Sequence, residues 1–151
     1  MKRLSTIFLA VLLLAGLFPA AAVGEDAGLS LSCPSAILME KETGTILYEQ
    51  DAHQKLEPAS VTKIMTLLLV MEAVDSGRIA LDDTVTVSAY AAGMGGSQVY
   101  LKEGEQMSVA EMIKCVTVVS GNDCAVALAE HLAGSEGAFV SLMNQRAQEL
   151  G

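Results

Sequence analysis

The sequence predicts an α+β fold in which helices cover an antiparallel sheet. Three observations lead to this prediction. Two β-prone segments flank a turn near the start of the folded part, a long apolar helix follows them, and the second half holds three more helices with clear ends. With 151 residues, 52% of them hydrophobic and 18% charged, the chain can form one domain with a real core and is not a disordered tail.

The net charge of −9 argues against a nucleic-acid partner, because proteins that bind nucleic acids present basic surfaces.

The first residues differ in composition from the rest of the chain. Lys2 and Arg3 precede an apolar run over residues 7–18, and small residues follow at 19–22. This pattern is typical of a cleaved secretory signal, which we assign to residues 1–23. The alternative is an uncleaved membrane anchor, although the run is short for a full span. Residues 24–34 then form a linker, and residues 35–151 form the folded part.

A hairpin is predicted from two β-prone stretches, residues 36–41 and 45–50. Between them lies Glu42-Thr43-Gly44, in which the glycine can adopt the positive φ that a tight turn requires.

The segment 60–75 is predicted to be a helix. It carries apolar residues on nearly every side, so we expect a buried central helix. Ser76-Gly77 ends it.

After that helix, residues 84–88 alternate like a short strand, residues 89–97 read as a loop, and residues 98–101 are expected to form another short strand. A capping box at Ser108 and Glu111 predicts the start of a helix that ends near Ser120-Gly121. Asn122 or Asp123 is expected to cap the following helix. Gly134 ends that helix, and the last one begins at about Ser135.

The three cysteines, Cys33, Cys115 and Cys124, do not form a disulfide framework. Cys115 and Cys124 lie on successive predicted helices and can pair only if their Cα atoms come within reach; buried free thiols are the alternative. Their spacing does not suit a metal site.

Ser60 and Lys63 are the first candidates for chemistry. They are three residues apart at the start of a helix, so both side chains project from the same face. A hydroxyl needs a base to become a good nucleophile, and an amine desolvated beside an apolar helix favours its neutral form, which can be that base. A capping serine and a solvated lysine would give the same spacing by chance. However, a lysine within an otherwise apolar helix requires a reason, because burying its charge is costly.

Ser120-Gly121-Asn122 is the second candidate feature and lies in the link between two helices. Ser120 could relay a proton, and Asn122 could hydrogen-bond a substrate amide. Taken alone, the triplet is better explained as a helix stop followed by a helix cap, although a helix–helix link can serve both purposes at once.

Together the two features resemble the Ser-x-x-Lys and Ser-x-Asn signature of β-lactamases and penicillin-binding proteins. The segment 57–66 (EPASVTKIMT) is similar to the nucleophile segment of the D-Ala-D-Ala carboxypeptidases of the peptidase S11 family, and 119–123 (VSGND) to their second motif. Segments 96–104 and 36–48 also fit. The resemblance covers residues 35–151 and implies a β-lactamase/transpeptidase-like fold.

The resemblance implies a role for each candidate residue. Ser60 attacks the peptide bond between two D-alanines of a peptidoglycan stem peptide and forms an acyl-enzyme. Lys63 is the general base, Ser120 passes a proton to the leaving D-alanine, and Asn122 binds the acyl-side amide. β-Lactam antibiotics would acylate Ser60 as substrate mimics. No cofactor is implied, and the expected location is the cell envelope, outside the cytoplasmic membrane.

One departure from the family is the missing Lys-Thr-Gly motif, which occurs nowhere in this sequence. We therefore interpret residues 35–151 as the N-terminal part of a catalytic domain and expect the chain alone to be inactive. Membrane association is expected only through a C-terminal region that the sequence lacks. The alternative functions are a serine β-lactamase, disfavoured by Gly121 where that class commonly has Asp, and a non-catalytic penicillin-binding sensor or envelope protein.

Overall fold

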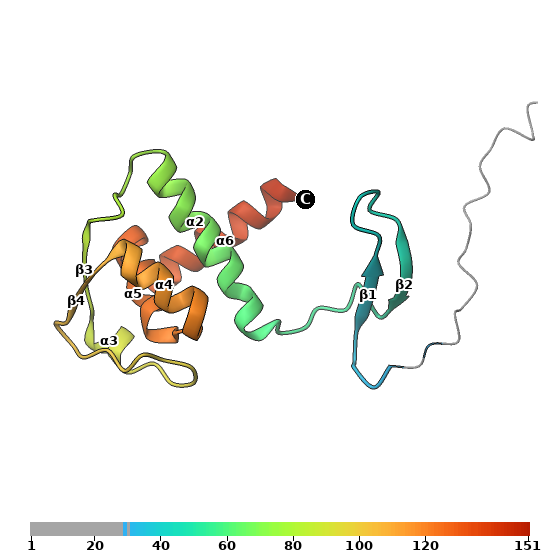
Figure 1. Ribbon diagram of the computed structural model, residues 1–151, viewed down its shortest axis with the longest axis horizontal. Coiled ribbons are helices and arrows are strands. Elements are labelled where there is room, and N and C mark those ends of the chain that lie inside the picture. The colour runs from blue at the N-terminus through green and yellow to red at the C-terminus, as the bar shows by residue number, and fades with distance from the viewer. Residues whose placement is uncertain (1–28, 30) are drawn as a thin grey trace, which may run out of the picture. The chain divides into compact units, whose positions relative to one another are not determined.

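The computed structural model describes residue 29 and residues 31–151, and the chain divides into two compact units at Leu56/Glu57. The predicted signal segment, residues 1–23, and part of the predicted linker lie outside the described residues. Four strands, the short 3₁₀ helix η1 and five α-helices make up the described part (Figure 1). The α+β prediction is confirmed. In the part of the chain that the structure describes, no helix is long and apolar enough to cross a membrane.

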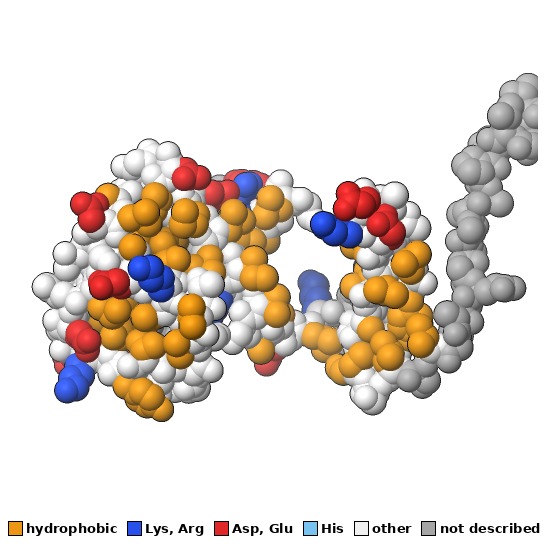
Figure 2. All heavy atoms as spheres, viewed as in Figure 1, with side chains coloured by type: hydrophobic (Ala, Val, Ile, Leu, Met, Phe, Trp, Pro, Cys, Tyr) orange, Lys and Arg blue, Asp and Glu red, His pale blue; other side chains and the backbone are white. Residues whose placement is uncertain are grey.

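The first unit contains the predicted hairpin, with β1 (Ala36–Met39) antiparallel to β2 (Ile46–Gln50). Its turn closes as expected, because Gly44 has φ +71° and its N–H donates to the Glu40 carbonyl at 2.9 Å. The Glu40 carboxylate accepts the N–H groups of Glu42 at 3.0 Å and Thr43 at 2.7 Å. Apolar side chains of this hairpin are about half exposed within the described residues (Figure 2); they are Ile37, Leu38, Met39, Ile46 and Leu47.

The second unit is built around α2 (Lys63–Asp75), which follows η1 (Ala59–Thr62). The predicted helix is thus present, but its first turn is 3₁₀. The expectation that it is buried all round is only partly met. Thr66, Val70 and Ala73 are buried, whereas Ile64 is 67% exposed. The reason is that α5 (Asn122–Ala133) and α6 (Glu136–Leu150) cover only one face of α2 among the described residues.

Strand β3 (Thr84–Thr86) pairs antiparallel with β4 (Gln106–Ser108), a strand that the sequence did not predict. Two further predictions in this region are wrong. The expected loop 89–97 begins with the short helix α3 (Ala89–Ala92), whose N-cap is Ser88. Residues 98–101 are not a strand, because a side chain instead of a neighbouring strand accepts the N–H groups of Val99 and Leu101.

Helix α4 (Val109–Val119) begins at the predicted capping box and ends at Ser120. It contacts α5, and α5 contacts α6. The core among these elements is apolar and mostly aliphatic. Its large fully buried side chains include Val70, Val85, Val87, Val109, Met112, Leu128 and Phe139. Burying each such side chain contributes about 1.5–3 kcal/mol.

In the structure Cys115 and Cys124 are free thiols. Burial, followed by the nearby Asp123 carboxylate, raises the pKa of the Cys124 thiol and keeps it protonated.

The capping box gives a testable pH dependence. Hydrogen bonds from the backbone N–H and the hydroxyl of Ser108 lower the pKa of Glu111 below its ordinary value of 4.5. A lowered folded-state pKa means that the ionised form stabilises the fold at neutral pH and that this contribution disappears as the pH falls below 4.5. We expect Glu111→Gln to be less stable than the parent in urea at pH 7, and this difference to shrink as the pH is lowered below 4.5. A stability difference that does not change between pH 7 and the lowest pH at which the protein stays folded would contradict this assignment.

Candidate active site

The nucleophile candidate Ser60 lies in η1, one turn ahead of Lys63, the first residue of α2. Ser60 is exposed and Lys63 is half-buried. The Lys63 Nζ lies 3.4 Å from the Ser60 Oγ. The predicted pairing across one helical turn is therefore present, at a distance that is long but still allows proton transfer to develop once a ligand binds.

Asn122 joins this pair from 59 residues further along the chain. Its Oδ1 accepts a hydrogen bond from the Lys63 Nζ at 2.6 Å. Its Nδ2 donates to the Gly95 carbonyl at 2.6 Å, which fixes the orientation of the side-chain amide. The Lys63 Nζ therefore lies between the Ser60 hydroxyl and the Asn122 side-chain amide and is within reach of both.

The expectation that Asn122 or Asp123 caps α5 is wrong. Gly121 occupies the N-cap position, and no side chain caps the helix there. Both polar side chains are engaged elsewhere: that of Asn122 with Lys63 and Gly95, and that of Asp123 with backbone N–H groups of residues 99 and 101. The Asp123 Oδ1 also accepts the N–H of Cys124 in the first turn at 2.9 Å, so Asp123 satisfies one free N–H of α5 from within the helix and not from the N-cap position.

Ser120 ends α4 in a left-handed conformation, with φ +61°. Its Oγ is buried and has no hydrogen-bond partner among the described residues. Buried hydroxyls are normally paired, so this group is ready to accept or donate a hydrogen bond. Ala59, which directly precedes Ser60, also has a positive φ of +47°. Backbone strain of this kind concentrates at functional sites.

A cavity of about 310 Å³ lies beside the Lys63 and Asn122 side chains. Its walls are mostly apolar and come from η1, α2, α5 and α6; they include Ala59, Thr66, Val126, Phe139, Val140 and Met143. An apolar cavity with a few convergent polar groups is the usual form of a small-ligand site.

Sequence reasoning missed the groups that hold Asn122 in place. The Ser97 carbonyl accepts the Asn122 backbone N–H at 2.7 Å, and the Gly95 carbonyl accepts the side chain. Every residue has a backbone carbonyl, so the sequence does not indicate which carbonyls accept these hydrogen bonds. Gly95-Gly96 indicates only that the backbone can approach another group closely at this point. A Cβ at Gly96 would lie 2.8 Å from the Asn122 Nδ2.

The sequence matches a known protein family. The model of peptidase S11, described as D-alanyl-D-alanine carboxypeptidase, matches residues 21–151. The chain belongs to the peptidase S11 family. The resemblance inferred from the two motifs is therefore confirmed.

Two curated S11 relatives are D-alanyl-D-alanine carboxypeptidases. The chain is 46% identical to DacF of Bacillus subtilis, covering 100% of the chain and 40% of that protein. It is 44% identical to DacC of Escherichia coli, covering 81% of the chain and 32% of that protein. This S11 chain thus spans well under half the length of these relatives.

Solved structures show the same fold. DacD from Francisella tularensis aligns with a TM-score of 0.76 and 37% identity, covering 91% of the chain and 33% of that structure. Penicillin-binding protein D2 from Listeria monocytogenes, in its ampicillin-bound form, aligns with a TM-score of 0.71 and 31% identity, covering 82% of the chain and 49% of that structure. The S11 chain therefore has the penicillin-binding protein, transpeptidase-like fold that the motifs implied.

Proposed function

We propose that the protein containing this chain is a serine-type D-Ala-D-Ala carboxypeptidase that trims peptidoglycan stem peptides through an acyl-enzyme on Ser60. The observation that carries the proposal is the position of the Lys63 Nζ, 3.4 Å from the Ser60 Oγ and 2.6 Å from the Asn122 Oδ1. One amine thus connects a nucleophile with a side-chain amide that can recognise a peptide. Family membership and the names of the relatives support the same reaction.

In the acylation step, the Ser60 Oγ attacks the carbonyl carbon of the penultimate D-alanine while Lys63 takes the hydroxyl proton. The negative charge moves to the carbonyl oxygen, and the backbone N–H of Ser60 supplies one stabilising hydrogen bond, worth about 3 kcal/mol. The C–N bond then breaks, and the terminal D-alanine leaves as an amine.

The leaving nitrogen needs a proton, and Ser120 is proposed to pass it on from Lys63. Its unpaired, buried Oγ supports this role because it is free to accept one hydrogen bond and donate another. Asn122 binds the acyl-side amide of the substrate. Water then attacks the ester and releases the shortened peptide.

A β-lactam would follow the same first step and remain on Ser60 as a slow ester. The ampicillin-bound and cefotaxime-bound forms of the Listeria monocytogenes homologue support this proposal. The substrate is a cell-wall component, so we also propose that the protein acts in the cell envelope after secretion.

The test is release of D-alanine from diacetyl-Lys-D-Ala-D-Ala by the full-length protein, with the same peptide ending in D-Ala-L-Ala as a control. We expect release of the terminal alanine only from the first peptide, slow turnover of penicillin, and loss of both reactions in Ser60→Ala. Rapid penicillin hydrolysis without D-alanine release would establish a β-lactamase instead. Reversible peptide binding without any turnover would establish a sensor. The same assay on residues 1–151 tests the sequence-based expectation that this chain alone is inactive.

A further inference from the structure

Asp123 carries a carboxylate that the proposed reaction does not use. The residue is completely buried at the second position of α5. Its Oδ2 accepts the N–H groups of Val99 and Leu101, both at 3.1 Å, and its Oδ1 accepts that of Cys124 at 2.9 Å. A buried carboxylate is costly unless several hydrogen bonds satisfy it, so these bonds strongly favour one loop conformation.

The loop over residues 95–101 is attached to Asn122 and Asp123 at every second residue. The carbonyls of Gly95 and Ser97 accept the side-chain and backbone N–H groups of Asn122. The N–H groups of Val99 and Leu101 then donate to Asp123. The first half of this loop therefore orients Asn122 toward Lys63, and Asp123 holds the second half in place.

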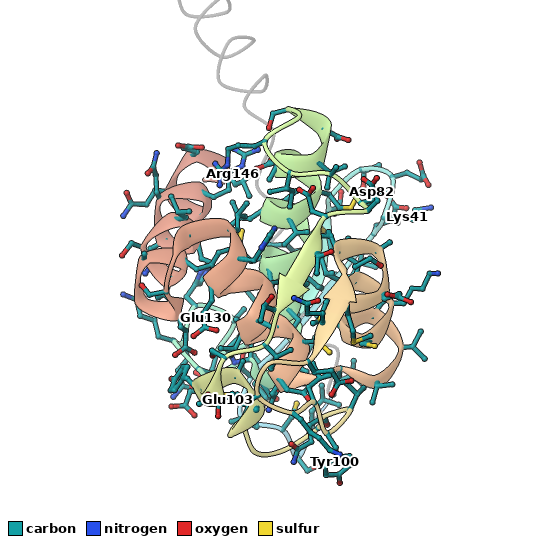
Figure 3. The ribbon with its side chains drawn as sticks, turned by 90° about the vertical axis from the view of Figure 1, so that its left-hand side faces the viewer. Lys41, Asp82, Tyr100, Glu103, Glu130 and Arg146 are labelled. Atoms are coloured by element: carbon teal, nitrogen blue, oxygen red, sulfur yellow. The ribbon has the colours of Figure 1, made fainter. Side chains whose placement is uncertain are left out.

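Tyr100 shows that the attachment imposes a conformation on the loop. Because its two neighbours donate to the same oxygen, Tyr100 is held with φ +63°, a left-handed conformation that is unfavourable for a residue with a Cβ. Its side chain is 77% exposed and projects away from the helices (Figure 3), so packing does not explain the strain.

We propose that Asp123 is a positioning residue for the S11 reaction: it holds the loop 95–101 so that Gly95 and Ser97 keep the Asn122 amide directed at Lys63. This inference rests on the proposed function, because it assigns Asp123 to the same site. It makes Asp123 necessary for the orientation of Asn122 and not only for the stability of the fold.

Asp123→Asn in the full-length protein is the main test, since it preserves the shape of the side chain and replaces an acceptor oxygen with a donor group. At a temperature where the variant is folded by circular dichroism, we expect the rate of acylation by a fluorescent penicillin to fall about 10- to 100-fold. We also expect the NMR signals of the Asn122 side-chain amide to shift. Glu105→Gln is the matched control, because the Glu105 carboxylate also accepts a loop N–H, that of Lys102 at 3.0 Å, but is exposed. Glu105→Gln should change neither the acylation rate nor the NMR signals of the Asn122 side-chain amide.

Tyr100→Gly supplies a rescue experiment. Glycine adopts a positive φ without the steric cost, so adding this substitution to Asp123→Asn should restore part of the lost acylation rate. Asp123→Ser, which keeps one acceptor oxygen, replaces the asparagine variant if that variant does not fold, with the same expected direction.

The result that would overturn the proposal is a folded Asp123 variant with a lower melting temperature but with acylation within twofold of the parent and unchanged Asn122 signals. Asp123 would then serve stability alone. If the parent itself is not acylated, the proposed function fails. In that case, the NMR signals of the Asn122 side-chain amide, compared between the parent chain of residues 1–151 and its Asp123→Asn variant, still decide whether Asp123 orients that side chain.

Discussion

Lys63→Met is expected to lower the rate at which a penicillin acylates Ser60 by about 10²- to 10⁴-fold, the range that a positioned general base contributes. Methionine keeps most of the volume and apolar character of the lysine stem but cannot accept a proton. It also removes the donor that bonds the Asn122 Oδ1 at 2.6 Å. The measurement is stopped-flow or gel-based labelling of the full-length protein with a fluorescent penicillin.

The control for this experiment is Lys114→Met on α4, which removes an exposed positive charge in the same unit. It should leave the labelling rate unchanged. If Lys63→Met retains acylation within about threefold of the parent, Lys63 is not the base, and the proposed mechanism is wrong at its first step.

Gly96→Ala is expected to have the second large effect, a loss of about 100-fold in the acylation rate. A Cβ at this position would meet the Asn122 Nδ2 at 2.8 Å, closer than real Cβ contacts, so we expect the Asn122 amide to be displaced from its present position against Gly95 and Lys63. A displacement of about 1 Å at an active site can cost a factor of this size. The backbone adds strain, because Gly96 has φ +78°, and we expect the free energy of unfolding to fall by about 1–3 kcal/mol.

Gly104→Ala separates these two causes. Gly104 has nearly the same backbone angle, φ +79°, but a Cβ there has no neighbour within 4 Å. We expect Gly104→Ala to lose similar stability in urea denaturation while it keeps its acylation rate. An equal loss of acylation in both variants would show that general destabilisation, and not the contact with Asn122, is responsible.

Much of the fold could be predicted because its signals are local. The turn at Gly44 and the capping box at Ser108 and Glu111 each depend on residues only a few positions apart, and the structure contains both. The conformation of the segment 98–101 could not be predicted, because the side chain of Asp123, more than 20 residues away, accepts its backbone N–H groups. Asp123 is not the N-cap of α5 because it is the second residue of that helix, and Gly121 occupies the N-cap position.

The candidate site was only partly predictable for the same reason. Helical spacing alone indicated that Ser60 and Lys63 share a face, and the structure places their side chains 3.4 Å apart. The approach of Asn122 to Lys63 depends on tertiary structure, so only the resemblance to the S11 motifs indicated it. The carbonyls that orient Asn122 could not be read from the sequence at all.

The central claim is that acyl transfer takes place on Ser60, and peptide mapping of the penicillin-treated protein tests it most directly. Trypsin cuts after Lys55 and Lys63, so the peptide 56–63 contains Ser60 as its only serine. We predict that the penicilloyl mass is found on this peptide and is absent from Ser60→Ala. A penicilloyl group on the peptide that carries Ser97 or on the one that carries Ser120 would contradict the account.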